Sequence, residues 1–267
     1  AEDGIRDKLV TGVQTCALPI SDFNPCHKTA PQVAEAISRG VRAAGALPFV
    51  FPTVSLHEAF SFPTSMLLRN LMAMDVEEMV KALPLDAVVL IGGCDKTIPA
   101  ELMGAISADM PAIVINVGSM LAGKHEGARL GACTDCRRLW AQFRAGTLDG
   151  PDLGRAHDQL MPTSGTCMVM GTASTMACLA ETLGFMLPGS ATAPAVSSDR
   201  WRFAEATGKR AAEMAIAGGP RPSEILTKSA LRNASVILQA TSGSTNAIVH
   251  LAAIAGRAGI QIGRAHV

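Results

Sequence analysis

Three cysteines of this sequence lie in similar surroundings that would suit metal binding. Cys26 occurs in DFNPCHKTAP, Cys94 in GGCDKTIPA and Cys167 in PTSGTCMVMGTAS, each in a turn rich in glycine, proline or threonine before a predicted helix. A helix N-terminus lowers the pKa of a thiol and favours the thiolate, the form that binds metal. Three thiolates from separate loops would suit an iron–sulfur cluster in which one iron lacks a protein ligand. Because no compact C-x-x-C run is involved, three buried structural cysteines are the open alternative.

Oxygen donors follow one of these cysteines directly. Asp95 and Lys96 come next after Cys94, and Glu58, in VSLHEAF, follows the first predicted strand at what would be the same edge of a sheet. Mg²⁺ prefers oxygen ligands, typically a few carboxylates together with waters or substrate oxygens. The run CDK therefore predicts a hard-metal site beside the soft one, with a surface ion pair between Asp95 and a lysine as the alternative.

A further cysteine pair, Cys133 and Cys136, forms the run C-T-D-C. Such a pair can serve thiol redox chemistry or supply half of a zinc site, but no second C-x-x-C and no matching H-x-x-x-H run follows. Two half-buried thiols without a role are the alternative.

The glycine-rich turns are weaker signals. Neither IGGCDK nor TSGSTNAI matches a nucleotide-binding motif, although residues 241–246 could hold a substrate carboxylate or hydroxyl, or simply cap a helix. Four histidines are interpreted as structural, the first being the most notable because it adjoins Cys26: His27, His57, His125 and His250.

The elements that would position these residues alternate along the chain. Nearly continuous apolar runs predict buried strands at 46–54, 86–93 and 111–118, as in a parallel sheet covered on both faces. Helical patterns follow or separate them, the third beginning with a proline suited to a first helical position. The predicted helices span 29–44, 65–83, 99–107, 168–186, 201–217, 223–233 and 245–258. This order indicates an α/β fold, a doubly wound, mostly parallel sheet flanked by helices, whose ligands collect beyond the carboxyl ends of the strands.

Composition excludes several classes of function. The 267 residues carry no formal net charge, only 4% are aromatic and none is tyrosine, which argues against nucleic-acid binding by electrostatics or base stacking. The nearly uncharged stretch 159–198 is punctuated by serine, threonine, glycine and proline, so no membrane span is predicted. Seven cysteines, an odd number spread along the chain, favour a reducing cytoplasm over a secreted disulfide framework.

The two ends of the chain look foreign to the rest. Residues 1–20 and 263–267 resemble translated sequencing-adapter sequence, so both, with Cys16 and His266, are left out of the predicted domain. The predicted iron–sulfur and magnesium domain then covers residues 21–262 and would be cut from a longer protein.

Four motifs together resemble the dihydroxy-acid dehydratase/phosphogluconate dehydratase family: NPCH, GGCDKTIPAELMGA, SGTCMVMGTASTMA and SGSTNAIVHLAAIAGR. The resemblance covers essentially residues 21–262 and implies the N-terminal α/β domain, with the C-terminal β-barrel-like domain absent. It implies that Cys26, Cys94 and Cys167 bind an iron–sulfur cluster, 2Fe-2S or 4Fe-4S, and that Glu58, Asp95 and Lys96 form a Mg²⁺ site. The lysine at this position is often carbamylated, which would turn an amine into an oxygen ligand.

The chemistry that the resemblance implies is dehydration of a 2,3-dihydroxy carboxylic acid to a 2-keto acid. In the family the base is a serine of the C-terminal domain, which also supplies one more magnesium ligand, so no catalytic base is expected in this chain and the fragment should be inactive alone. The segment VSLHEAFSFPTSMLLRNLMAMDVEEM, and CDKT followed by PA, are closer to the sugar-acid (aldonate) branch than to the branched-chain enzymes. Family members are dimers or tetramers.

Two alternatives of other classes stay open. One is a thiol redox or zinc-binding protein that uses Cys133 and Cys136, and the other is a non-catalytic α/β ligand-binding domain with buried cysteines. Iron and sulfide content distinguishes the dehydratase from both.

Overall fold

A computed structural model of the chain describes residues 13–262 and shows a four-stranded parallel sheet with the strand order β2-β1-β3-β4. The strands are β1 (Val13–Pro19), β2 (Leu47–Thr53), β3 (Ala87–Gly92) and β4 (Ala112–Asn116). β1 pairs in parallel with both β2 and β3, and β3 pairs in parallel with β4. All four carboxyl ends therefore lie at one edge of the sheet.

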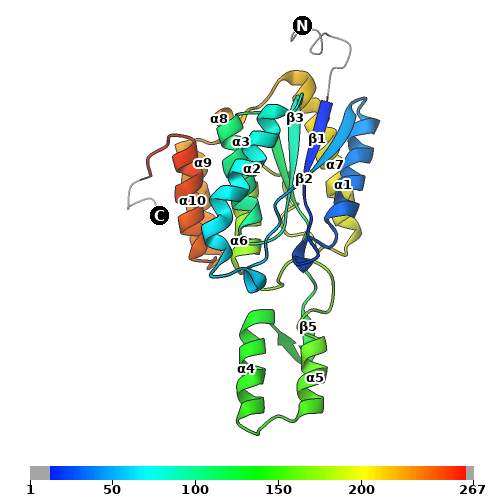
Figure 1. Cartoon of the computed structure of the whole chain (residues 1–267), viewed down its shortest axis with the longest axis vertical. Coiled ribbons are helices and arrows are strands. Elements are labelled where there is room, and N and C mark those ends of the chain that lie inside the picture. The colour runs from blue at the N-terminus through cyan, green and yellow to red at the C-terminus, as the bar shows by residue number, and fades with distance from the viewer. Residues whose placement is uncertain (1–12, 263–267) are drawn as a thin grey trace.

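Helices cover both faces of this sheet (Figure 1). On one face lie α1 (Ala30–Ala43) and α7 (Ser198–Ala217); on the other lie α2 (Arg69–Ala82), α3 (Thr97–Ala108), α6 (Thr172–Thr182), α9 (Lys228–Ala240) and α10 (Asn246–Arg257). Successive strand residues point to opposite faces, so Val89 and Ile91 enter the core with α1 and α7, whereas Val88 and Leu90 enter the other core. The predicted doubly wound α/β fold is confirmed.

A small arm follows β4. It contains the hairpin of β5 (Gly123–His125) and β6 (Ala128–Leu130), then α4 (Ala132–Arg144) and α5 (Gly150–Asp158). The arm has its own small core of Leu130, Leu139, Leu153, Ala156 and Leu160. In Figure 1 the arm projects from the main body at the end where the strands finish. The short elements η1 (Pro25–His27), η2 (Glu58–Phe60), η3 (Ser65–Leu68) and α8 (Pro222–Ile225) complete the described elements.

Part of the segment excluded on sequence grounds belongs to the sheet. Residues 13–19, which were left out of the predicted domain together with Cys16, form a strand in the interior of the sheet, and Cys16 is 1% exposed. VQTCALP is short and shows no alternation because both faces of the strand are covered, so periodicity could not reveal it. The remaining residues of the two ends, 1–12 and 263–267 with His266, lie outside the described residues.

Other predictions need smaller corrections. β2 lies at one edge of the sheet and is largely exposed, whereas β4, at the other edge, is buried throughout. α3 begins at Thr97, two residues before the proline that was expected to start it. α2 begins at Arg69, after the short helix η3, rather than at residue 65. The helix predicted at 223–233 is divided by a break into α8 and the longer α9. No described helix has the length and apolarity needed to cross a membrane.

Candidate metal centre

The candidate site lies where the winding of the sheet changes direction. From β1 the chain crosses by α1 to β2 on one side, and from β3 it crosses by α3 to β4 on the other. The loops that follow β1 and β3 therefore diverge at the carboxyl edge, which is where ligands of such sheets bind. Cys26, in η1, follows β1, and Cys94 follows β3. Two cysteines that are far apart in sequence thus meet because their strands are neighbours.

Three soft or borderline donors gather at this edge. The thiols of Cys26 and Cys94 and one ring nitrogen of His57 all lie within 4.8 Å of one another. Both cysteines are buried and His57 is half-buried. A hydrogen bond with Cys26, followed by burial, raises the pKa of the Cys94 thiol above its usual range. At Cys94 the lowering expected from the helix N-terminus is therefore outweighed, and a bound cation is what would favour its thiolate.

His27 fixes the backbone of Cys94. The backbone N–H of Cys94 donates to His27 Nε2 at 3.0 Å, so His27 carries its proton on Nδ1, which lies 2.7 Å from Ser55 Oγ. Burial, with a smaller effect of His57, lowers the pKa of His27 to about 3 and keeps the ring neutral. A Cβ on Gly93 would lie 2.7 Å from His27 Cδ2 and 2.6 Å from Val117 Cγ2, so glycine lets the ring approach. His27, which follows Cys26 in the sequence, thereby positions Cys94.

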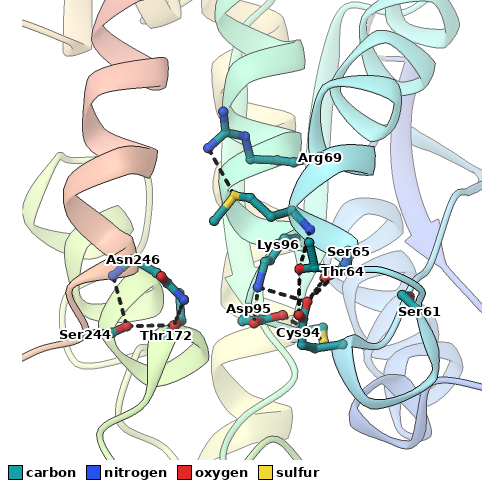
Figure 2. A network of polar contacts seen from close by, with 12 residues as sticks. Ser61, Thr64, Ser65, Arg69, Cys94, Asp95, Lys96, Thr172, Ser244 and Asn246 are labelled. Carbon is teal, nitrogen blue, oxygen red and sulfur yellow. Dashed lines mark hydrogen bonds and ion pairs between the residues drawn. The ribbon is translucent and has the colours of Figure 1, made fainter.

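Oxygen donors and a lysine form a second group on the other side of Cys94 (Figure 2). Lys96 Nζ lies 2.6 Å from Asp95 Oδ2 and 3.1 Å from Glu58 Oε2, and its side chain is 3% exposed. Glu58 accepts hydrogen bonds from Thr64 Oγ1 at 2.6 Å, from the backbone N–H of Ser65 at 3.1 Å and from the Ser65 hydroxyl. These contacts fix both carboxylates, and the ion pair predicted as the alternative for Asp95 is present but buried rather than superficial.

The charges of this group are strongly coupled. Partial burial alone would raise the pKa of Glu58, but hydrogen bonds from Ser65, Thr64 and Lys96 outweigh it and lower the pKa to about 2. Burial likewise opposes the charge of Lys96, yet Asp95 and Glu58 raise its pKa. An ammonium group therefore lies between two carboxylates, in a place whose chemistry also suits a divalent cation.

Cys167 lies at the same edge of the sheet but outside the soft group. Its neighbour Thr166 forms a parallel bridge with Ser119, just beyond β4, and the Thr166 N–H donates to Gly118 O at 2.9 Å. Cys167 is half-buried and is not among the donors that lie within 4.8 Å of one another. The structure thus brings Cys26 and Cys94 together, whereas a role for Cys167 rests on its position in the loop before α6.

Sequence reasoning treated His57 as structural, and the geometry places it with the two thiols. The only signal for it was its position immediately before Glu58. His250 also faces this region: Arg69 donates to His250 Nδ1 at 2.9 Å, and burial, then the charges of Arg69 and Lys96, lower the pKa of His250 to about 3. His250 is therefore a buried neutral ring, consistent with its structural interpretation.

The turn before α10 is hydrogen-bonded to the start of α6. The hydroxyls of Thr172 and Ser244 lie 2.7 Å apart, and Asn246 Nδ2 donates to Thr172 Oγ1 at 3.4 Å, which joins the starts of α6 and α10 (Figure 2). The Ser244 N–H donates to Thr175 Oγ1 at 3.0 Å. Neither α6 nor α10 has a side-chain hydrogen bond at its N-cap residue, so residues 244–246 link two helix starts rather than cap a helix in the simple sense.

The arm carries a separate donor group. His125, Glu126 and Asp152 offer donor atoms within 4.8 Å of one another, but Asp152 is already held by Arg155 at 2.8 Å. Cys136 is half-buried in the first turns of α4. The C-T-D-C run is therefore helical and lies in the arm.

The domain presents sulfur donors and oxygen donors on consecutive residues at the switch point of its sheet. Such an arrangement is suited to one soft and one hard metal centre. A sequence model of the dihydroxy-acid/6-phosphogluconate dehydratase N-terminal region matches residues 13–267. The chain therefore belongs to this family of dehydratases.

Curated relatives agree. The chain is 47% identical over 242 residues to L-arabonate dehydratase of Azospirillum brasilense, covering 91% of this chain and 41% of the relative. It is 41% identical over 242 residues to 6-deoxy-6-sulfo-D-gluconate dehydratase of Pseudomonas putida, covering 91% and 42%. It is 36% identical over 249 residues to dihydroxy-acid dehydratase of Clostridium botulinum, covering 91% and 44%. The chain thus spans less than half the length of these relatives.

Proposed function

We propose that this chain is the cofactor-binding part of a hydro-lyase that dehydrates a 2,3-dihydroxy carboxylic acid to a 2-keto-3-deoxy acid. The observation that carries the proposal is the division of donors at the switch point: Cys26 and Cys94 meet on one side, and Asp95 and Glu58 meet around Lys96 on the other. Thiolates select soft iron–sulfur centres and carboxylates select Mg²⁺. The donor chemistry therefore fits both groups implied by the family.

Each residue has a distinct part in this proposal. Cys26, Cys94 and Cys167 would hold the iron–sulfur cluster, which when bound supplies a Lewis acid for the departing C3 hydroxyl group. Glu58, Asp95 and Lys96 would hold Mg²⁺. A divalent cation beside Lys96 would lower the pKa of its amine, and carbamylation at Nζ would then replace the ammonium with an oxygen ligand.

The chain's own residues also orient the site. The hydrogen bond from Cys94 N–H to His27 fixes the turn between the thiol and Asp95, and Thr64 and Ser65 fix Glu58. A base that removes the C2 proton is expected from the part of the protein beyond this chain, so the full-length protein, as a homodimer or homotetramer in the cytoplasm, would be the active form. A sugar acid such as a pentonate or hexonate is the proposed substrate, because the relatives named for such acids share more identity than the dihydroxy-acid dehydratase does.

The test is iron, acid-labile sulfide and visible absorbance of protein purified without oxygen. Near-stoichiometric cluster is expected, with loss in the separate variants Cys26→Ser, Cys94→Ser and Cys167→Ser, because serine is a poor ligand for soft iron. Cys136→Ser is the matched control and should retain the cluster. A well-folded chain without iron after reconstitution would refute the proposal. Loss of thiol redox activity or of bound zinc in Cys136→Ser, together with unchanged iron content in Cys94→Ser, would instead favour the redox or zinc alternative.

A further inference from the structure

We propose that His57 donates an N–H···S hydrogen bond to the thiolate sulfurs of the cluster site and thereby raises the reduction potential of the cluster. The inference rests on the proposed function, because it assigns a residue to the same cofactor. His57 belongs neither to the three cysteines nor to the magnesium group of that proposal.

The position of the ring supports this role. One ring nitrogen of His57 lies within 4.8 Å of the sulfurs of both Cys26 and Cys94. The ring is held from two sides: the Ala59 N–H donates to His57 Nδ1 at 3.2 Å, and the Phe60 ring lies 5.5 Å away, centroid to centroid. The side chain is thus fixed beside the thiols by its own short helix, η2.

The same contacts assign the proton of the ring. Because the Ala59 N–H donates to Nδ1, that nitrogen is the acceptor and the ring proton lies on Nε2. Coordination of a metal through Nε2 would require the proton on Nδ1, where it would oppose the Ala59 N–H, and coordination through Nδ1 would displace that N–H. Because Nδ1 is already engaged by Ala59, Nε2 is the nitrogen left to interact with the thiols, and with its proton it would do so as a hydrogen-bond donor rather than as a ligand. His27 has the opposite tautomer, since its Nε2 accepts from Cys94 N–H.

The chain order repeats a pattern already seen at Cys94. There, consecutive residues serve the two sides of the site, with Cys94 among the sulfurs and Asp95 beside Lys96. His57 and Glu58 are also consecutive, with His57 among the sulfurs and Glu58 beside Lys96. The loops after β2 and β3 therefore each contribute one residue to each side.

A hydrogen bond to a cluster sulfur stabilises the reduced, more negative form, and such contacts help set reduction potentials. Removing the donor should shift the midpoint potential to more negative values without removing a ligand. His57→Phe keeps an aromatic ring against Phe60 and removes the N–H group. His57→Gln keeps an N–H donor of similar reach. His125→Phe, in the arm, is the matched control for exchanging histidine for phenylalanine.

The experiment is a redox titration of the anaerobically reconstituted chain, followed by visible absorbance and electron paramagnetic resonance, with iron and sulfide counted in every sample. We expect His57→Phe to keep full iron and sulfide but to have a more negative potential, with His57→Gln closer to the parent and His125→Phe equal to it. An unshifted potential in His57→Phe overturns the inference, as does a loss of iron that would mark His57 as a ligand. A parent chain that takes up no cluster refutes the proposed function itself, so the two failures are distinguishable.

Discussion

Glu101 is a buried carboxyl group for which the site offers no partner. It lies in α3, one turn after Lys96, and is 1% exposed. Neither carboxyl oxygen has a hydrogen-bond partner among the described residues, and Oε2 lies 2.8 Å from where a Cβ on Gly92 would be. Burial raises the pKa of Glu101 well above its usual range, so the folded protein holds this group protonated. We predict that replacing Glu101 with methionine stabilises the protein.

The magnitude follows from two separate costs. A buried polar group without a partner costs about 1–3 kcal/mol, and methionine of similar size removes that cost at little expense in packing. The second cost depends on pH. The unfolded state releases the proton above the ordinary pKa of 4.5, whereas the folded state retains it, so the stability of the parent falls as pH rises, by up to about 1.4 kcal/mol per pH unit.

Two variants separate these costs. Glu101→Met removes both, and should be more stable than the parent by about 1–3 kcal/mol at pH 4.5 and by more at pH 7. Glu101→Gln cannot ionise but keeps a buried polar group, so it should remove only the pH-dependent part. Leu102→Met on the same helix, a fully buried exchange of similar volume, is the control and should show the pH dependence of the parent.

The assay is urea unfolding of the metal-free chain, followed by circular dichroism at pH 4.5 and pH 7. A Glu101→Met protein that is less stable than the parent at both values would show that the carboxyl group makes a stabilising interaction, and the reasoning would fail. Equal pH dependence in the parent and in Glu101→Gln would show that Glu101 is not held protonated.

Three further predictions concern the site itself. Gly93→Ala should cost about 1–3 kcal/mol in urea unfolding, because its Cβ would meet the His27 ring, whereas Gly154→Ala, with open space around it in α5, should be neutral or slightly stabilising. Glu58 has a lowered pKa, so its stabilising effect is present above pH 4.5 and lost as pH falls toward 2; Glu58→Gln should flatten that part of the stability–pH curve. Lys96→Ala should weaken Mg²⁺ binding in calorimetry while iron content stays constant, and joint loss of both metals would contradict separate groups.

The sequence predicted β2, β3 and β4 but not β1, which lies between β2 and β3. Runs of valine and isoleucine mark β3 and β4, which are covered on both faces. β1 was not predicted because residues 1–20 resemble translated adapter sequence and show no clear periodicity, and were therefore left out of the predicted domain. This omission mattered, since β1 is what places Cys26 beside Cys94 at the switch point.

The residues of the candidate site could also be predicted only in part. Asp95, Lys96 and Glu58 meet as expected, because the loops after parallel strands converge at one edge. The position of His57 beside the thiols could not be predicted from residue types, since it depends on the hydrogen bond that its Nδ1 accepts from the Ala59 N–H at the start of η2. The pKa of Cys94 was also out of reach, because proximity to another thiol and burial reverse the effect expected of the helix N-terminus.

The two sides of the site are separated by donor chemistry rather than by distance. Asp95 contacts both sides: its Oδ1 lies 3.4 Å from Cys94 Sγ, and its Oδ2 lies 2.6 Å from Lys96 Nζ. At such separations no side chain of the described residues lies between the two donor groups. Which metal each group binds must then depend on the preference of thiolates for soft metals and of carboxylates for hard ones. Placing the two donor types on consecutive residues fixes the spacing between the centres through the backbone alone. If both metals bind as proposed, a substrate that presents a hydroxyl to one side and a carboxylate to the other would be oriented by the short turn from Cys94 to Lys96.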